Sequence, residues 1–224
     1  MAPSLSYDVL SRKLLGLYTP VVSDVLDHLG VKENVMSPSI RPAYTGARIA
    51  GPAFTARAEF FPGYREGEDF SPLVRMMSQV GPHQVVVTAT GGKTACAVWG
   101  ELMSHSARGS GAVGAVTDGV VRDVPLIMKM KSRFPVFSAG FSPADSIGRS
   151  KIVETGRTIT CGGLRVRPGD YIFGDLDGVV VIPREKVAEA IEAAEEKVIT
   201  ETEFRNSIKK GMSLADAVAK YKTM

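Results

Sequence analysis

The chain has 224 residues, of which 44% are hydrophobic, and this is enough to bury the core of one α/β domain. Its 27 basic and 24 acidic residues leave a formal charge of +3, a balance that argues against nucleic acid as a partner. We find no leader-like N-terminus and no apolar run of membrane-spanning length, so we expect a cytoplasmic protein without a membrane partner. Cys96 and Cys161 lack metal-site spacing, and we expect both to be reduced and buried.

Periodicity and turn residues predict one domain over 1–224, with N-terminal helices (1–46), an α/β core (47–183) and a C-terminal helical extension (184–224). Helices are predicted over residues 8–17, 21–29, 72–80, 124–132, 184–210 and 214–222, and another begins near Gly100. Strands are predicted over residues 47–61, 84–90, 112–116 and 135–139, with two more within 171–183. Residues 159–167 are predicted to form an edge strand with a bend at Gly162-Gly163. The helix over 184–210 is longer than its own core can cover, so it is a candidate subunit contact.

Three familiar catalytic patterns are not supported. The string at 91–94, Gly-Gly-Lys-Thr, lacks the first glycine of a phosphate-binding loop, because Val87 takes that position inside a predicted strand. The three histidines lie at ordinary helix or turn positions without a nucleophile elbow. Neither Lys93 nor Lys151 lies in the apolar surroundings that activate a Schiff-base lysine. The catalytic pattern that remains is chemistry assisted by carboxylates and a metal ion.

The stretch Gly111–Pro125 carries the clearest functional signal. A small apolar run ends at Asp118-Gly119, and Arg122 and Asp123 follow two hydrophobic residues later. In open α/β sheets, ligands bind beyond the carboxyl ends of the strands. A guanidinium there can bind a carboxylate, and a carboxylate there can hold a divalent cation. Without further context, an Asp-Gly turn followed by a structural ion pair is the simpler interpretation.

A second signal is the predicted helix start at Gly100-Glu101. The first backbone N–H groups of a helix have no partner within the helix, so they can bind an anion. Alternatively, Glu101 only complements the positive end of the helix dipole. The residues themselves leave both interpretations open.

Three motifs taken together resemble the RraA-like family: Gly100–Met103, the Asp-Gly-x-x-Arg-Asp string within Gly111–Asp123, and Gly174–Pro183. This family includes 4-hydroxy-4-methyl-2-oxoglutarate / 4-carboxy-4-hydroxy-2-oxoadipate aldolases and the regulator of ribonuclease E activity. The resemblance covers roughly residue 49 to the C-terminus. It implies a three-layer β/β/α sandwich like the swivelling phosphohistidine domain, assembled as a homotrimer or homohexamer.

The resemblance also implies a metal-dependent site. The aspartate at position 123 binds a divalent metal, Mg²⁺ or Mn²⁺, and Arg122 holds the pyruvyl part of a keto acid substrate. Glu101 lies in the hydrated outer shell of the metal, where the family aldolases often carry aspartate.

Further roles follow from the same resemblance. The backbone amides of Leu102 and Met103, just after Gly100, receive the substrate carboxylate. Glu201, from the C-terminal helix of another subunit, completes a shared active site, with Glu196 as the alternative.

The resemblance therefore implies a class II pyruvate aldolase that cleaves a 4-hydroxy-2-oxo acid such as 4-hydroxy-4-methyl-2-oxoglutarate. Oxaloacetate decarboxylation is an expected side activity, because it passes through the same pyruvate enolate. Two alternatives remain: a non-catalytic regulator that binds a ribonuclease or helicase, and a metal-dependent hydratase or hydrolase acting on another keto acid. Arg65, Lys93 and Arg149 are candidates for binding a distal carboxylate of the substrate.

Overall fold

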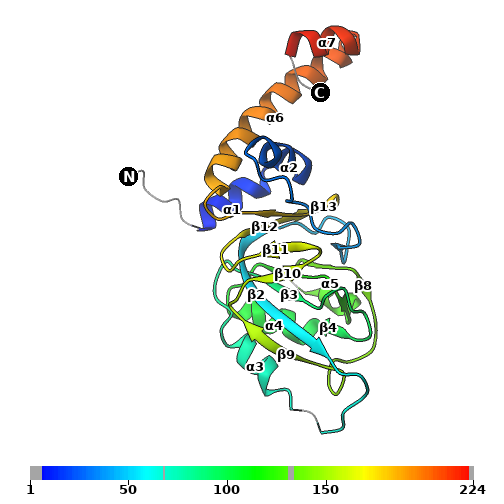
Figure 1. Cartoon of the computed structure of the whole chain (residues 1–224). Helices are drawn as coiled ribbons and strands as arrows, with labels where there is room; N and C mark the ends of the chain where they lie inside the picture. Colours follow the sequence, from blue (N-terminus) through cyan, green and yellow to red (C-terminus); the bar gives the residue numbers. More distant parts are fainter. Residues whose placement is uncertain (1–6, 68, 131–133, 222–224) are drawn as a thin grey trace.

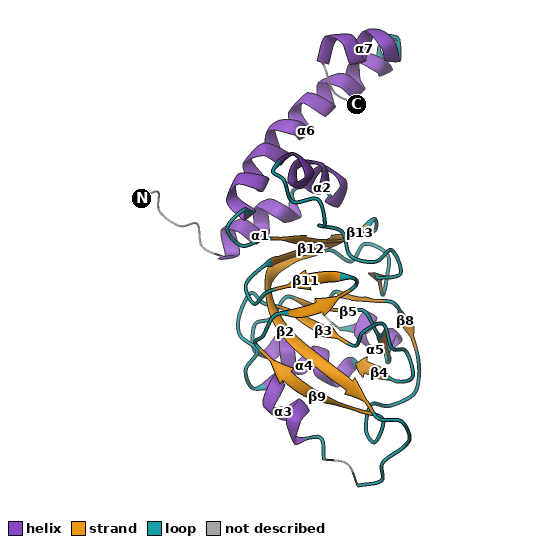
Figure 2. Cartoon of the chain, viewed as in Figure 1, coloured by secondary structure: helices purple, strands orange, loops and turns teal. Residues whose placement is uncertain are grey.

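The computed structural model describes residues 7–67, 69–130 and 134–221 of the chain. It confirms the predicted α/β fold with helices at both ends (Figure 1). The terminal helices lie together at one end of the molecule, and the strands, with shorter helices among them, form the rest (Figure 2). None of the helices in the described ranges combines the length and the apolar character needed to cross a bilayer.

One long strand, β2 (Ile49–Phe60), lies within the main sheet and is buried along most of its length. On one side it pairs in parallel with β3 (Val85–Ala89). On the other side its first residues pair with β12 (Tyr171–Asp175) and its last residues with β9 (Ser150–Thr155), both antiparallel. The pattern over 47–61 correctly predicts β2. The sequence does not predict β9, because its residues are mostly half buried and show no clear alternation.

The main sheet continues in both directions from these strands. Beyond β3 lie β5 (Gly114–Thr117) and β7 (Val136–Ser138), which are parallel to it, and then the short antiparallel strand β1 (Arg41–Pro42). Beyond β12 lies its antiparallel neighbour β13 (Gly178–Ile182). The apolar runs predict β3, β5 and β7 because a parallel strand covered on both faces needs small or apolar residues at nearly every position.

Helices α3 (Ser71–Met77), α4 (Glu101–Gly109) and α5 (Val124–Lys129) connect the parallel strands and form one apolar layer with a face of the main sheet. The helix predicted over 124–132 ends earlier than expected, because Met130 already has an extended backbone. The last part of that prediction, 131–132, lies outside the described residues.

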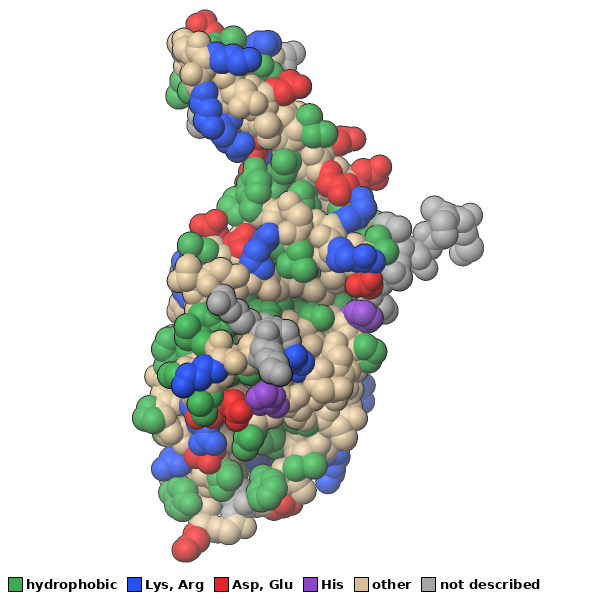
Figure 3. Space-filling model, turned by 180° about the vertical axis from the view of Figure 1, so that it is seen from behind, with side chains coloured by type: hydrophobic (Ala, Val, Ile, Leu, Met, Phe, Trp, Pro, Cys, Tyr) green, Lys and Arg blue, Asp and Glu red, His purple; other side chains and the backbone are tan. Residues whose placement is uncertain are grey.

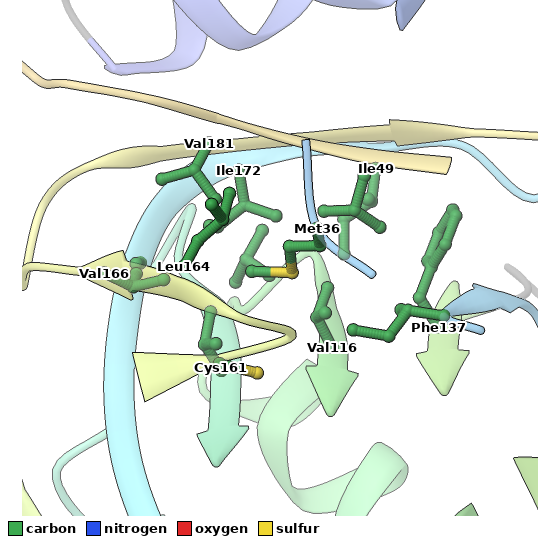
Figure 4. Close-up of a cluster of buried hydrophobic side chains, with 14 of the residues drawn as sticks. Met36, Ile49, Val116, Phe137, Cys161, Leu164, Val166, Ile172 and Val181 are labelled. Atoms are coloured by element: carbon green, nitrogen blue, oxygen red, sulfur yellow. The ribbon is translucent and has the colours of Figure 1, made fainter. Parts of the chain in front are cut away.

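A two-stranded hairpin covers the other face of the main sheet. Its strands, β10 (Ile159–Cys161) and β11 (Leu164–Val166), form a separate sheet, so the prediction of one edge strand over 159–167 is wrong, although the chain does turn at the predicted Gly162-Gly163 bend. The Gly162-Gly163 pair reverses the chain, since both residues have positive φ angles that favour glycine. Side chains of the hairpin pack into the core that it shares with the main sheet (Figure 4). Helices, main sheet and hairpin form the predicted three layers.

Both cysteines are free and buried, in agreement with the prediction. Burial raises the thiol pKa of Cys161 and of Cys96. The Cys96 thiol also donates a hydrogen bond to the Ser150 hydroxyl at 3.5 Å. Since a protonated, buried thiol is a poor nucleophile, neither cysteine is a candidate for catalysis.

The N-terminal helices and the start of the C-terminal helix cover the outer face of β12 and β13. Helices α1 (Tyr7–Leu15) and α2 (Thr19–His28) pack there with the first part of α6 (Val187–Lys209). The buried residues of α6 all fall within Val187–Ala194. The rest of α6, together with α7 (Leu214–Tyr221), projects from the sheets as an arm (Figure 1). Hydrophobic side chains are visible on this arm among charged ones (Figure 3).

A buried carboxylate holds α2 against the sheet. Asp175, at the end of β12, accepts hydrogen bonds from the backbone N–H of Thr19 (2.8 Å) and from its hydroxyl (2.6 Å). Thr19 is the first residue of α2, where the backbone N–H has no acceptor within the helix. Asp175 also accepts the N–H of Asp177 (3.0 Å), so the same carboxylate stabilises the turn between β12 and β13. Asp177 itself is exposed.

Asp175→Ala should lower the free energy of unfolding by about 2–3 kcal/mol, because it removes a charged acceptor and leaves the Thr19 donors unpaired. Asp177→Ala, at an exposed position of the same turn, should lower it by less than about 0.5 kcal/mol. Urea unfolding followed by circular dichroism measures both values. Equal effects of the two substitutions would contradict the capping role.

Candidate active site

Three parallel strands of the main sheet continue after a bend into a second, smaller sheet. β3 is followed by β4 (Ala97–Trp99), β5 by β6 (Val120–Val121), and β7 by β8 (Gly140–Phe141). The parallel order β4-β6-β8 repeats the order β3-β5-β7. The carboxyl ends of the three short strands therefore lie at one edge, where ligands bind in parallel sheets. Strands of two or three residues show no periodicity, so the sequence does not predict this sheet.

Asp118, a buried aspartate, stabilises the bend. Its carboxylate accepts hydrogen bonds from the backbone N–H groups of Thr90 (2.6 Å), Gly92 (3.3 Å) and Gly162 (3.3 Å). The next residue is glycine because a Cβ at Gly119 would lie 2.7 Å from Thr90 Cγ2. The Asp-Gly turn expected from the sequence thus also links the loop after β3 to the hairpin.

The first strand end leads directly into α4. Gly100 is the N-cap and Glu101 the first residue of this helix, which confirms the predicted helix start, and the N-cap glycine has no side chain of its own to cap the helix. Trp99 donates a hydrogen bond from Nε1 to Ser104 Oγ (2.9 Å), and this hydroxyl donates to the Gly100 carbonyl (2.9 Å). The buried indole therefore helps to define the position of the first turn of α4.

Asp123, at the second strand end, holds its side chain over the start of α4. Its backbone is left-handed (φ 59°, ψ 25°), which is uncommon for residues other than glycine. Asp123 is the N-cap of α5, but its carboxylate makes no capping bond there. Instead, Oδ2 accepts the Glu101 N–H at 3.4 Å. A Cβ at Gly100 would lie 2.7 Å from Oδ2, so glycine leaves room for this carboxylate.

Arg122 lies between two carboxylates. Its Nε is 3.3 Å from Asp123 Oδ2, and its Nη1 is 3.1 Å from Asp145 Oδ2. Asp145 belongs to the loop that follows β8, the third of these short strands. The sequence alone does not indicate a role for this residue. Its position after a predicted parallel strand is the signal that could have identified it, because the ends of parallel strands share one edge of the sheet.

The first turn of α4 contributes the remaining residues predicted for the site. Glu101 Oε1 lies 3.1 Å from His105 Nε2, one turn further along the helix. The side chain of Leu102 is exposed and that of Met103 is half buried. The backbone N–H groups of both lie where the helix offers no acceptor. The structure thus brings the predicted residues of 100–103 together with Arg122-Asp123.

Glu201 lies elsewhere in the same chain. It is on α6, beyond the part of that helix that is buried, and it accepts a hydrogen bond from the Tyr18 hydroxyl. Burial raises the pKa of Tyr18, and the neighbouring Glu201 raises it further. Glu196, the alternative, precedes Glu201 on the same helix. A role for either in the site requires a second subunit.

The carboxylates at the strand ends fit a hard divalent cation. The side chains of Glu101, Asp123 and Asp145 are 23%, 34% and 37% exposed, so a hydrated ion can reach them. Within the described ranges, no three His, Cys, Asp or Glu side chains converge to form a metal cage. Mg²⁺ binds proteins through one or two carboxylates and keeps several waters, and Mn²⁺ accepts the same oxygen ligands. Asp123 with water fits such an ion.

Comparison with known proteins identifies related sequences. A family model described as RraA-like (Aldolase/RraA) matches residues 19–181. The chain is 31% identical to a protein of Halalkalibacterium halodurans named "Putative 4-hydroxy-4-methyl-2-oxoglutarate aldolase", with 80% of this chain and 79% of that protein covered. It is 30% identical to Protein DlpA of Legionella pneumophila over 95% of this chain. That match spans about a third (34%) of DlpA.

A solved structure shares the fold. RraAS2 of Streptomyces coelicolor, described as an unusual member of the RNase ES inhibitor RraA protein family, aligns with a TM-score of 0.78. The two sequences are 25% identical, and the alignment covers 88% of this chain and 96% of that one. The similarity therefore extends over most of the architecture described above.

Asp123→Gly should be more stable than Asp123→Ala by roughly 1 kcal/mol, because both lack the carboxylate but only glycine adopts a positive φ without strain. Urea unfolding measures the difference. At Asp145, which has no positive φ, the Gly variant should not be the more stable of the corresponding pair. Equal stability of the two Asp123 variants would contradict the left-handed backbone at this position.

Proposed function

The chain belongs to the RraA-like family, and on this premise we propose that it is a metal-dependent carbon–carbon lyase. It cleaves a 4-hydroxy-2-oxo acid to pyruvate and a second carbonyl compound. Relatives named for 4-hydroxy-4-methyl-2-oxoglutarate aldolase activity support this proposal. The observation that carries it is the convergence of the Asp123 carboxylate, the Arg122 guanidinium and the first amides of α4 at neighbouring strand ends.

Each of these groups has its own task. Arg122, held from two sides by Asp123 and Asp145, binds the pyruvyl part of the substrate. The backbone N–H groups of Leu102 and Met103 receive the substrate carboxylate at the positive end of α4. Asp123 would hold Mg²⁺ or Mn²⁺, which, when bound, supplies Lewis-acid stabilisation of negative charge on the keto acid.

Cleavage breaks the bond between C3 and C4 of the substrate. A water held by the Glu101 carboxylate takes the proton of the C4 hydroxyl, and the oxygen then forms the new C4 carbonyl. The electron pair of the broken bond moves towards the keto group and gives the enolate of pyruvate, whose charge Arg122 helps to stabilise. Protonation at C3 completes pyruvate. Loss of CO₂ from oxaloacetate gives the same enolate, so decarboxylation is an expected side activity.

A second candidate function is that of a non-catalytic regulator that binds a ribonuclease. The similarity to Streptomyces coelicolor RraAS2, described as a member of the RNase ES inhibitor family, favours it. Because one fold can serve both functions, only the chemistry of the site can distinguish the two candidates. A regulator has no need of enolate chemistry, and a test for the enolate separates the two candidates.

With Mg²⁺ or Mn²⁺ in D₂O, the protein should exchange the methyl protons of pyruvate for deuterium, because exchange requires only the enolate. Proton NMR follows the loss of the methyl signal. Asp123→Ala should slow exchange by about 100-fold or more, whereas Asp177→Ala, in an exposed turn, should leave the rate unchanged. Undiminished exchange after exhaustive chelation would contradict metal dependence. The absence of exchange with either metal would favour the regulator.

We also propose that the active site is shared between the subunits of a homotrimer or homohexamer. The arm that carries Glu201 leaves several apolar side chains exposed, namely Ile199 (63%), Leu214 (56%) and Val218 (37%). Exposed apolar side chains on a part of the chain that projects from its own core are typical of protein contacts. An arm packed against a second copy of the chain would bring Glu201 to the strand ends of that copy.

Co-expression of Asp123→Ala subunits with Glu201→Ala subunits should restore activity that each variant lacks alone. In a random mixture, about a quarter of the shared sites combine an intact Asp123 with an intact Glu201 from the neighbour. Pyruvate exchange therefore should recover to about a quarter of the wild-type rate. If Glu196→Ala is inactive alone and is complemented in the same way, while Glu201→Ala alone is active, the role belongs to Glu196. No recovery with either would contradict a shared site.

A further inference from the structure

A surface depression opens beside Arg122 and Asp123, between the start of α5 and the loop after β8. Apart from those two residues, its lining is apolar except for one hydroxyl: Val121, Val124, Pro125, Phe141, Pro143 and Ser142. Phe141 is 60% exposed, which leaves most of an aromatic side chain in contact with water. Ligand sites commonly combine such apolar walls with a few polar groups that orient the ligand.

The described residues of this lining include no cation besides Arg122. In the proposed reaction, Arg122 is occupied by the pyruvyl part of the substrate. The three cations considered for a distal carboxylate are not part of the lining. Each lies over an aromatic ring instead: Arg149 over Tyr64 (5.2 Å), Lys93 over Phe60 (5.8 Å) and Arg65 over Phe61 (4.1 Å).

The loop after β8 also directs Arg149 to a different task. Arg149 Nη1 donates a hydrogen bond to the backbone carbonyl of Asp145 at 3.1 Å. The carboxylate of Asp145, in contrast, contacts Arg122. Arg149 therefore supports the loop that positions Arg122 and does not line the depression.

We propose that the depression binds the part of the substrate beyond C4, and that it selects 4-hydroxy-2-oxo acids whose second product is an apolar aldehyde or ketone. The proposal rests on the proposed function. Arg122 and Asp123 belong to the lining, and Asp123 also contacts the start of α4, so a substrate held by its carboxylate at α4 can extend past this pair into the depression. An alkyl or aryl group would cover Phe141 and Pro143 and remove apolar surface from water.

A second carboxylate in the same place would be disfavoured. The substrate in the names of the relatives, 4-hydroxy-4-methyl-2-oxoglutarate, carries one at this end of the molecule. Among the described residues of this chain, Arg122 is the only cation of the lining and the pyruvyl part occupies it, so a second carboxylate would lose water without gaining a cationic side chain. The lining thus predicts a substrate preference that differs from the one in those names.

The test compares two substrates of nearly equal size, 4-hydroxy-2-oxohexanoate and 4-hydroxy-2-oxoglutarate, which release propanal and glyoxylate respectively besides pyruvate. Proton NMR of the pyruvate methyl signal, which propanal and glyoxylate do not share, gives kcat/KM for each. We expect the wild-type protein to favour the hexanoate by about 10-fold or more. Phe141→Arg should reverse this preference by supplying a cation, whereas Phe141→Leu should retain it. Native mass spectrometry checks that both variants assemble like the wild type.

The outcomes distinguish the subsite from the reaction. Equal rates, or a preference for 4-hydroxy-2-oxoglutarate, while pyruvate exchange persists would overturn the subsite and leave the proposed function intact. Altered assembly of Phe141→Arg would also overturn it, because the apolar lining would then be a subunit interface. If neither substrate is cleaved and pyruvate exchange is absent, the proposed function fails and the subsite fails with it.

Discussion

The candidate site depends on the bend that carries three parallel strands out of the main sheet, and the buried Asp118 carboxylate stabilises that bend. This carboxylate accepts hydrogen bonds from backbone N–H groups of the loop after β3 and of the hairpin that covers one face of the main sheet. Beyond the bend, the strands pair again in the same order. Gly100, Arg122 and Asp145 therefore arrive at one edge, although about 20 residues separate each from the next along the chain.

At this edge, the side chains of the site are oriented at some cost in the stability of the local backbone. Asp123 has a left-handed backbone and does not cap its own helix, two features that cost free energy at most positions. In return, its carboxylate reaches both Arg122 and the start of α4. Asp145 fixes the opposite side of the guanidinium. A guanidinium held from two sides loses less freedom when a substrate binds, so the site is already organised for a carboxylate or keto group.

The helical arm is connected to the rest of the fold by a different kind of contact. An apolar cluster joins the first part of α6 to the N-terminal helices. Polar pairs then extend this contact along the arm: Lys13 with Glu195 (2.8 Å), Lys197 with Asp24 (2.6 Å), and Tyr18 with Glu201. Exposed ion pairs contribute little stability one by one, so the apolar cluster stabilises the helix and the pairs favour one orientation. The direction of the arm is thus determined before any subunit is added.

Local patterns in the sequence are sufficient to predict the α/β class and most helices and parallel strands, because apolar periodicity and turn chemistry are local properties. They mark 100–103 and 122–123 only as candidates, and the roles expected of these residues come from the resemblance to the RraA-like family. Three features are not visible in the sequence: 159–167 forms a separate hairpin, β4, β6 and β8 form a second sheet, and Asp145 contacts Arg122. These features arise from pairing between distant segments, and two-residue strands leave no local pattern. The apolar depression beside the site has the same origin, since β6, α5 and the loop after β8 each contribute only part of its lining.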